Sequence, residues 1–219
     1  MKSKKSIIVS ITLFLVFSLL TLLLIYEDVN FVGETNKEVG LSGINEKYSY
    51  LEYNKVVDII SDIPLFLSIA LIGVLAVTGF IQLIKRKSLF KVDKDITIFG
   101  VFIIVLAIFW IAFDKFFIIN YRPILIDGEV EPSYPSTHIL IVTFTMLSSI
   151  SILYKYLKNR KIIIVMNLIS SLLISITFVL RLASGMHWFT DCLGGMILGL
   201  SMYCLYVALK KEKLIEEEK

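Results

Sequence analysis

The chain contains only two histidines, and each lies in a stretch that carries other chemically useful residues. His138 ends the stretch SYPSTH and opens an apolar run, whereas His187 lies in the stretch RLASGMHWFTD, four residues before Asp191. Residues at this spacing share a face if the local backbone is helical. An Asp that accepts a hydrogen bond from one ring nitrogen leaves the other free as nucleophile or base. We therefore predict a catalytic pair of His187 and Asp191, with His138 as a second acid–base group.

Three cationic residues lie in or near these stretches, and together they suit a phosphate dianion. They are Lys115 and Arg122 in KFFIINYRP and Arg181 in RLASGMHWFTD. Arginines can offer paired donors to phosphate oxygens. Ser136 stands just before a helix expected to start near His138, so its hydroxyl and the free backbone N–H groups could donate to the same anion. A single cation at a helix end is ordinarily explained by snorkelling to the membrane interface, but the whole set indicates a phosphate site.

A metal-assisted mechanism has little support in the sequence. The two cysteines, Cys192 and Cys204, fall in one apolar block and cannot pair with each other along a helix. Asp127, Glu129 and Glu131 could bind a cation, but their spacing is not that of a known metal loop. We therefore expect no metal and no cofactor.

The composition shows which elements must position these residues. The chain is 57% hydrophobic, against roughly 45–50% in soluble domains. The apolar residues are concentrated in blocks long enough to cross a hydrocarbon core of about 30 Å, and in lipid each block must be helical. We predict an all-α polytopic membrane protein of six transmembrane helices, forming one domain over residues 1–219. The blocks are Ile7–Tyr26, Ile63–Ile84, Ile96–Phe113, Ile139–Tyr154, Ile162–Leu180 and Cys192–Leu209.

The first block resembles a secretory signal but is longer than a typical apolar core of such signals, and no small-x-small cleavage site follows it. We interpret it as a retained anchor. The polar, acidic residues 27–62 that follow form the predicted first extracytoplasmic loop. We interpret this loop mainly as a solvated connector, with a possible interfacial helix in YLEYNKVVDIISDI.

Orientation in the membrane follows from Lys and Arg, which accumulate on the cytoplasmic side. Only 6 of the 22 Lys and Arg residues fall in the first, third and fifth connections between the apolar blocks. The other 16 lie at the two termini and in the second and fourth connections. We therefore predict that both termini are cytoplasmic, which places every candidate site residue at the extracytoplasmic face of a cell membrane. The net charge of +3 then gives no indication of nucleic-acid binding. The six outer residues are Lys37, Lys47, Lys55, Lys115, Arg122 and Arg181.

The stretches KFFIINYRP, PSTH and RLASGMHWFTD resemble, in order and in internal spacing, the three signature motifs of the type 2 phosphatidic acid phosphatase superfamily. These membrane lipid phosphatases are related in fold to vanadium haloperoxidases. The resemblance covers residues 115–191. Thr137 stands where the family has Gly, and it either narrows the pocket or contributes a hydroxyl. Leu180 stands where the family has Ser, which removes a hydroxyl but no essential charge.

The resemblance implies a role for each candidate residue. His187 would attack phosphorus and form a phosphohistidine, oriented by Asp191. His138 would protonate the leaving group and then deprotonate the hydrolytic water. The phosphoryl oxygens would be bound by Lys115, Arg122, Arg181, Ser136 and the backbone near Thr137.

A phosphate site at the interface suits an amphiphilic substrate whose tail remains in the bilayer. Undecaprenyl diphosphate, phosphatidylglycerol phosphate, phosphatidate and diacylglycerol diphosphate all present the same terminal phosphate, and the motifs do not rank them. An outward-facing site favours an isoprenoid diphosphate, because that location suits carrier-lipid recycling. A phosphotransferase would use the same residues, and a non-catalytic lipid-binding or transport protein is a further alternative. The sequence leaves the oligomeric state open.

Overall fold

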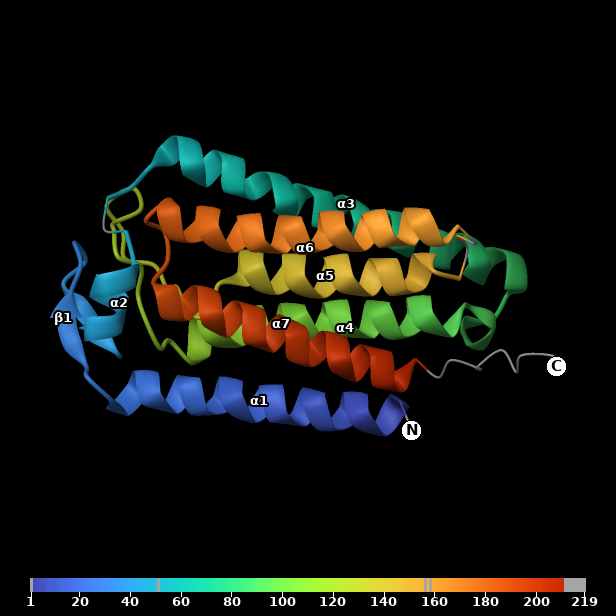
Figure 1. Ribbon diagram of the computed structural model, residues 1–219, viewed down its shortest axis with the longest axis horizontal. Helices are drawn as coiled ribbons and strands as arrows, with labels where there is room; N and C mark the ends of the chain where they lie inside the picture. The colour runs from blue at the N-terminus through green and yellow to red at the C-terminus, as the bar shows by residue number, and fades with distance from the viewer. Residues whose placement is uncertain (1, 51, 156, 158, 211–219) are drawn as a thin grey trace.

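The computed structural model describes residues 2–50, 52–155, 157 and 159–210. Its long helices lie side by side in one bundle (Figure 1). Each predicted apolar block coincides with one of them. The long helices are α1 (Lys2–Tyr26), α3 (Lys55–Arg86), α4 (Lys94–Ile111), α5 (Thr137–Leu153), α6 (Arg160–Ala183) and α7 (Phe189–Leu209).

In the described residues, five helices are long and apolar enough to cross a membrane. The sixth, α5, is apolar but has only 17 residues, so its spanning the bilayer stays a prediction. The outer faces of the bundle carry large apolar side chains, such as Leu15 (63% exposed), Val74 (61%) and Leu168 (66%). Such a surface needs lipid around it, since soluble monomers rarely expose large apolar patches. The predicted multi-pass membrane architecture is therefore supported.

The predicted first loop, residues 27–62, is wrong at its end, because α3 begins at Lys55 and not near Ile63. Asn54 caps this helix by accepting a hydrogen bond from the backbone N–H of Val57 (3.1 Å). The stretch read as a possible separate interfacial helix is therefore largely the first turns of α3. Its acidic residues belong to the bundle and not to a solvated connector.

The remaining residues 27–54 also have structure of their own. Strands β1 (Asn30–Val32) and β2 (Lys37–Val39) pair in an antiparallel hairpin, followed by helix α2 (Ser42–Tyr48). Asn45 in α2 donates to the Thr190 hydroxyl (3.0 Å) and accepts from the Thr190 backbone N–H (3.2 Å). The segment therefore covers the start of α7.

Small residues bring α7 close to its neighbours. Ser10 in α1 and Ser201 in α7 each donate to the other's carbonyl oxygen, at 2.8 and 2.9 Å. A Cβ added to Gly194 would lie 2.5 Å from the Tyr134 ring, and one added to Gly195 would overlap the Ser136 carbonyl oxygen. Close packing of this kind suits membrane helices, where no hydrophobic force drives association. The buried core beside these contacts combines aliphatic side chains with aromatic rings, such as Tyr134 stacked on Phe17.

Two further short helices connect the bundle. The 3₁₀ helix η1 (Leu89–Lys91) lies between α3 and α4, and the π-helix η2 (Ala112–Phe116) continues α4. After η2 the chain runs through residues 117–136 without a helix before α5 begins.

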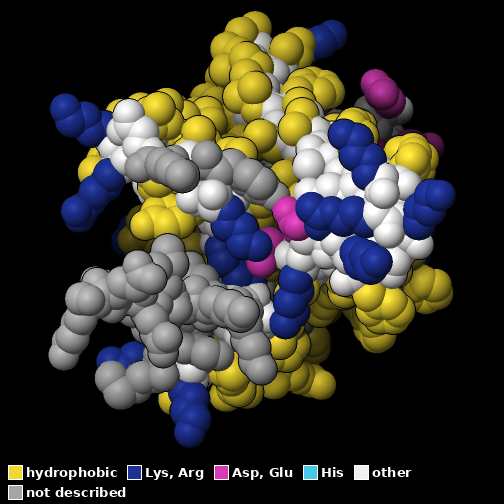
Figure 2. All heavy atoms as spheres, turned by 90° about the vertical axis from the view of Figure 1, so that its right-hand side faces the viewer, with side chains coloured by type: hydrophobic (Ala, Val, Ile, Leu, Met, Phe, Trp, Pro, Cys, Tyr) yellow, Lys and Arg dark blue, Asp and Glu magenta, His cyan; other side chains and the backbone are white. Residues whose placement is uncertain are grey.

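Lys and Arg gather at one end of the bundle, where α1 begins and α7 ends (Figures 1 and 2). This end includes the α3–α4 and α5–α6 connections, as the predicted topology requires. The opposite end carries the segments that contain both histidines. The predicted cytoplasmic residues Lys158, Lys211, Lys213 and Lys219 lie outside the described residues.

The contact at Gly195 generates a prediction about packing. We expect Gly195→Ala to lower the melting temperature in detergent, because overpacking costs about 1–3 kcal/mol and a chain of this length loses roughly 2–4 °C per kcal/mol. Gly100→Ala is the matched control, since nothing lies within 4 Å of its added Cβ. An equal melting temperature for the two variants, measured by thermal unfolding, would contradict the close approach of α7 to Ser136.

Candidate active site

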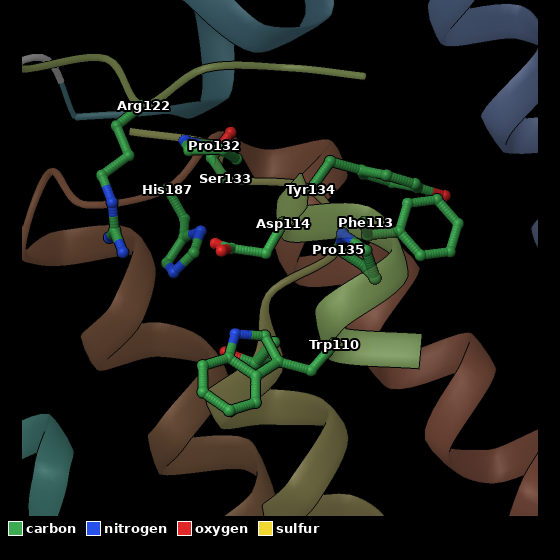
Figure 3. Close-up of a pocket in the computed structure, with 10 residues that line it drawn as sticks. Trp110, Phe113, Asp114, Arg122, Pro132, Ser133, Tyr134, Pro135 and His187 are labelled. Atoms are coloured by element: carbon green, nitrogen blue, oxygen red, sulfur yellow. The ribbon is translucent and has the colours of Figure 1, made fainter. Parts of the chain in front are cut away.

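A small cavity of about 50 Å³ lies at the end of the bundle that carries the histidines. It is formed where α4 and η2, the 117–136 segment, the start of α5 and the segment before α7 meet (Figure 3). Its lining combines aromatic and polar side chains: Trp110, Phe113, Asp114, Arg122, Pro132, Ser133, Tyr134, Pro135, Thr137 and His187.

His187 lies outside a helix, so the helical backbone that would place it on one face with Asp191 is absent. Trp188 is the N-cap of α7, so His187 precedes the helix and Asp191 lies in its first turn. The His187 Nδ1 is nevertheless 3.7 Å from Asp191 Oδ2. That distance suits an attraction between charges but is too long for a hydrogen bond. By distance and angle neither ring nitrogen makes a hydrogen bond in the described structure, although the Ser133 backbone lies close enough to interact with the ring. A small shift of the ring would bring Nδ1 to Asp191.

Asp191 is fully buried and joins three segments of the chain. Its carboxylate accepts from the Trp188 backbone N–H (3.0 Å) and from the Asn120 amide (3.2 Å). Its backbone carbonyl accepts from the Ser136 N–H (3.0 Å). Asp191 therefore holds the 117–136 segment and the start of α5 against the start of α7. Sequence reasoning missed Asn120, although it lies inside the first motif.

The environment of His187 favours a neutral imidazole. Its side chain is buried, and burial is the main cause that lowers the pKa of His187 well below its ordinary value of 6.5. The positive charges of Arg181 and Arg122 lower this pKa further. A neutral ring keeps a lone pair on one nitrogen at neutral pH, which a nucleophile needs.

Ser136 is the N-cap of α5, as the sequence predicted, and Thr137 is the first helical residue. The Ser136 side chain is fully buried and its hydroxyl has no hydrogen-bond partner in the described structure. A buried hydroxyl without a partner is costly unless a ligand or water supplies one. Thr137 lines the cavity, so the residue that replaces the family's Gly lies at the site.

The two arginines reach the site from different elements, and each already has a carboxylate partner. Arg122 lines the cavity, and its Nε donates to Glu131 Oε2 at 3.0 Å. Arg181, near the end of α6, is 1% exposed and its Nη1 donates to Asp58 Oδ1 at 2.6 Å. The Arg181 Nε has no partner in the described structure, so part of this guanidinium remains available.

Of the predicted site residues, three line the cavity: Arg122, Thr137 and His187. Ser136, His138, Arg181 and Asp191 lie behind this lining, and Lys115 lies away from it. The Lys115 side chain is 71% exposed, and its Nζ pairs with Asp114 Oδ2 at 2.8 Å. Asp114 lines the cavity, and its carboxylate points toward the ring of His187, with Arg122 on the other side (Figure 3). The sequence analysis missed Asp114, which directly precedes the first motif.

His138 contacts a residue that falls within the predicted first loop. Its Nε2 lies 3.0 Å from Asp62 Oδ1 in α3. Asp58, one turn earlier, is the partner of Arg181. The available signal was the spacing of these two carboxylates, which places them on one face once α3 is known to include them.

The structure contains no metal site in its described part: no three His, Cys, Asp or Glu residues there are grouped so as to hold an ion. In the acidic stretch considered as a possible cation site, Glu131 pairs with Arg122. The two cysteines are free, with Cys192 buried and Cys204 half-buried.

A second cavity, of about 130 Å³, is lined almost entirely by apolar side chains of α3, α4 and α5. It shares Trp110 and Thr137 with the first cavity. Such a lining suits hydrocarbon and gives a polar group no partner. The other lining residues are Ile69, Ile72, Ile103, Leu106, Ala107, Leu140 and Ile141.

Comparison with known proteins agrees with the resemblance found in the motifs. Residues 113–214 match the model of the PAP2 superfamily. The structure is similar to the crystal structure of a transmembrane PAP2-type phosphatidylglycerolphosphate phosphatase from Bacillus subtilis, with a TM-score of 0.58 and 20% sequence identity. The alignment covers 90% of this chain and 94% of that chain, which shows a shared fold. No match is found among curated protein sequences.

The buried state of His187 can be tested by nuclear magnetic resonance. With two histidines in the chain, a His138→Ala variant labelled with ¹⁵N-histidine reports on His187 alone. Because the pKa of His187 is lowered, we expect its ring to stay neutral as the pH falls from about 8 to about 6. Protonation of the ring near its ordinary pKa would contradict the buried, cation-flanked environment.

Proposed function

We propose, from the PAP2 superfamily region at residues 113–214, that this chain is a membrane lipid phosphatase that releases the terminal phosphate of a lipid phosphate or diphosphate. The observation that carries this proposal is the position of His187. Its buried imidazole lines a cavity together with Arg122, and an apolar cavity adjoins it. A nucleophile, an anion-binding group and a place for hydrocarbon therefore lie together.

In the first step, a ring nitrogen of His187 attacks phosphorus while the bond from phosphorus to the lipid oxygen breaks. His138 gives a proton to that oxygen, so the lipid leaves as a neutral alcohol or, from a diphosphate, as a lipid monophosphate. Asp191, 3.7 Å from Nδ1, orients His187 and stabilises the positive ring. The product is a phosphohistidine.

In the second step, water attacks the phosphohistidine. His138 accepts a proton from this water as its oxygen bonds to phosphorus, and the bond from phosphorus to His187 breaks. Inorganic phosphate and the free imidazole result. These two reaction steps need no metal, because the cations of the site stabilise the charge on the transferring phosphoryl group.

The phosphoryl oxygens are bound by Arg122, by Arg181 and by the Ser136 hydroxyl with the backbone near Thr137. The unpartnered Arg181 Nε and Ser136 Oγ support this assignment, since both are buried polar atoms that a ligand would satisfy. Lys115 is proposed for the same role. To fill it, the Lys115 Nζ must exchange Asp114 for a phosphoryl oxygen.

The substrate is an amphiphile whose tail occupies the apolar cavity or the adjoining bilayer. The volume and lining of the apolar cavity suit an acyl or prenyl segment next to the headgroup. Phosphatidylglycerol phosphate, the substrate class named for the structural neighbour, is a candidate beside phosphatidate and undecaprenyl diphosphate. All of them place a terminal phosphate next to hydrocarbon.

We further propose six transmembrane helices in a single domain, with both termini cytoplasmic and the site on the extracytoplasmic side of the cell membrane. The gathering of Lys and Arg at the end opposite the site supports this orientation. A span through α5 is feasible despite its 17 residues, because the lower limit for a spanning helix is about that length.

The activity is tested by measuring phosphate release from pure lipid phosphates in detergent with EDTA present. We expect turnover by the unmodified protein. The rate of phosphate release by His138→Ala should fall about 10²–10⁴-fold on a lipid phosphomonoester, because its alkoxide is a poor leaving group. On p-nitrophenyl phosphate, a better leaving group, the same variant should recover part of that rate. His187→Ala should remain near background on both substrates, because a better leaving group cannot replace the nucleophile.

Three outcomes would contradict the proposal. Phosphate release only in the presence of an added acceptor would identify a strict phosphotransferase. Complete loss of phosphate release in EDTA, with activity restored by a divalent ion, would overturn the metal-independent mechanism. Recovery of His187→Ala, in place of His138→Ala, on the aryl phosphate would reverse the roles of the two histidines.

Topology can be tested by labelling single cysteines with an impermeant reagent in intact cells. Glu129 lies exposed at the site end, and Phe90 is 99% exposed at the basic end, so both positions accept a reporter. In a Cys204→Ala background, we expect Glu129→Cys to react and Phe90→Cys to react only after the membrane is opened. Cys192 is buried and serves as an internal unreactive residue. The reverse pattern would place the site in the cytoplasm.

A further inference from the structure

Helix α3 contributes a polar face to the site, although it lies outside residues 113–214 and outside all three motifs. Its first turns carry Asp58, Ser61 and Asp62. Asp58 and Ser61 both contact Arg181 Nη1, at 2.6 and 3.0 Å. Asp62 contacts His138 at 3.0 Å. Helix α3 therefore contacts both Arg181, the proposed phosphate-binding cation, and His138, the proposed general acid.

The contact between Asp62 and His138 has the geometry of an orienting pair. The 3.0 Å distance from His138 Nε2 to Asp62 Oδ1 is that of a full hydrogen bond. Among the described ion pairs, Asp62 is the carboxylate that reaches this ring, and its Oδ1 is also 4.0 Å from Arg181 Nη1. With Nε2–H donated to Asp62, the ring is held in one orientation and its Nδ1 is the nitrogen not engaged by this carboxylate.

The charges around His138 explain why such a partner is needed. Arg181 approaches from α6 and Arg122 from the 117–136 segment, and the ring of His187 lies before α7. Burial and the two nearby positive charges oppose a protonated imidazole, and the adjacent Asp62 carboxylate offsets part of this effect. Asp62 is therefore the neighbour that both holds the His138 ring and favours its charged form.

We propose that Asp62 is a positioning residue for the general acid: it accepts a hydrogen bond from His138 Nε2–H and so directs the Nδ1 proton to the leaving oxygen. The proton that His138 gives up in the first step is replaced from water in the second. The inference rests on the proposed phosphatase activity, because it assigns a role within that reaction.

The test uses Asp62→Asn, which keeps the shape but removes the charge. On a lipid phosphomonoester we expect kcat to fall about 10–100-fold, less than on removal of the whole acid, with KM changed less than about threefold. On p-nitrophenyl phosphate kcat should fall less than about threefold, because a good leaving group needs little protonation. Asp62→Glu should recover part of the loss on the lipid.

Two comparisons separate this role from a structural one. Asp58→Asn, one turn away, contacts the phosphate-binding Arg181 and should affect both substrates alike. Asp127→Asn is the matched control, since Asp127 is exposed and its left-handed backbone (φ 51°) also suits Asn. It should behave as the unmodified protein on both substrates.

The decisive measurement is the double variant. If Asp62 acts through His138, adding Asp62→Asn to His138→Ala should cost no further activity on the lipid substrate. Multiplicative losses would overturn the proposal, as would an equal loss on both substrates by an Asp62→Asn protein that keeps its melting temperature. If Asp62→Asn does not fold, failure of a folded Asp62→Glu to discriminate between the substrates would overturn it. Absence of phosphate release by the unmodified protein would instead overturn the proposed function itself.

Discussion

The buried carboxylate of Asp191 is the interaction on which the rest of the site depends. It satisfies the first turn of α7 through Trp188 and holds the preceding segment through Asn120, while its carbonyl binds the N–H of Ser136. Among apolar helices, an unpaired polar backbone group costs several kcal/mol, so these bonds fix where the three motif segments meet. Gly195 makes the arrangement possible, because a side chain there would overlap the Ser136 carbonyl.

A second constraint is the balance of charge. Each cationic or potentially cationic group of the predicted site, except His187, has a carboxylate within hydrogen-bond distance. A buried cation is costly without a counter-ion, and Arg181, at 1% exposure, illustrates the need most clearly. At the proposed site, a phosphate dianion would have to compete with these carboxylates or bind beside them, which would limit how tightly inorganic phosphate is retained. The pairs are Arg122–Glu131, Arg181–Asp58, Lys115–Asp114 and His138–Asp62.

Much of this fold could be predicted from the sequence, because lipid imposes helices of a known length on apolar blocks. The position of Ser136 directly before α5 could also be predicted, since this residue precedes an apolar run. The start of α3 could not be predicted, because the first turns of this helix are polar and resemble a loop. The partners Asp58 and Asp62 escaped notice for another reason: they meet Arg181 and His138 through packing of helices far apart in sequence, and spacing along one segment carries no such information. The pairing of Lys115 with Asp114 could not be predicted either, because spacing gives a residue's position but not the direction of its side chain.

The adjoining cavities, which meet at Trp110 and Thr137, have opposite preferences for solvent. If a lipid phosphate reacts at this boundary, its two products belong to different phases. The liberated alcohol remains dissolved in hydrocarbon, whereas orthophosphate diffuses into water and is diluted there. Recombination would require both to return to the same boundary from separate compartments. Partitioning would thus make hydrolysis effectively one-way, even if the chemical equilibrium within the site were nearly even.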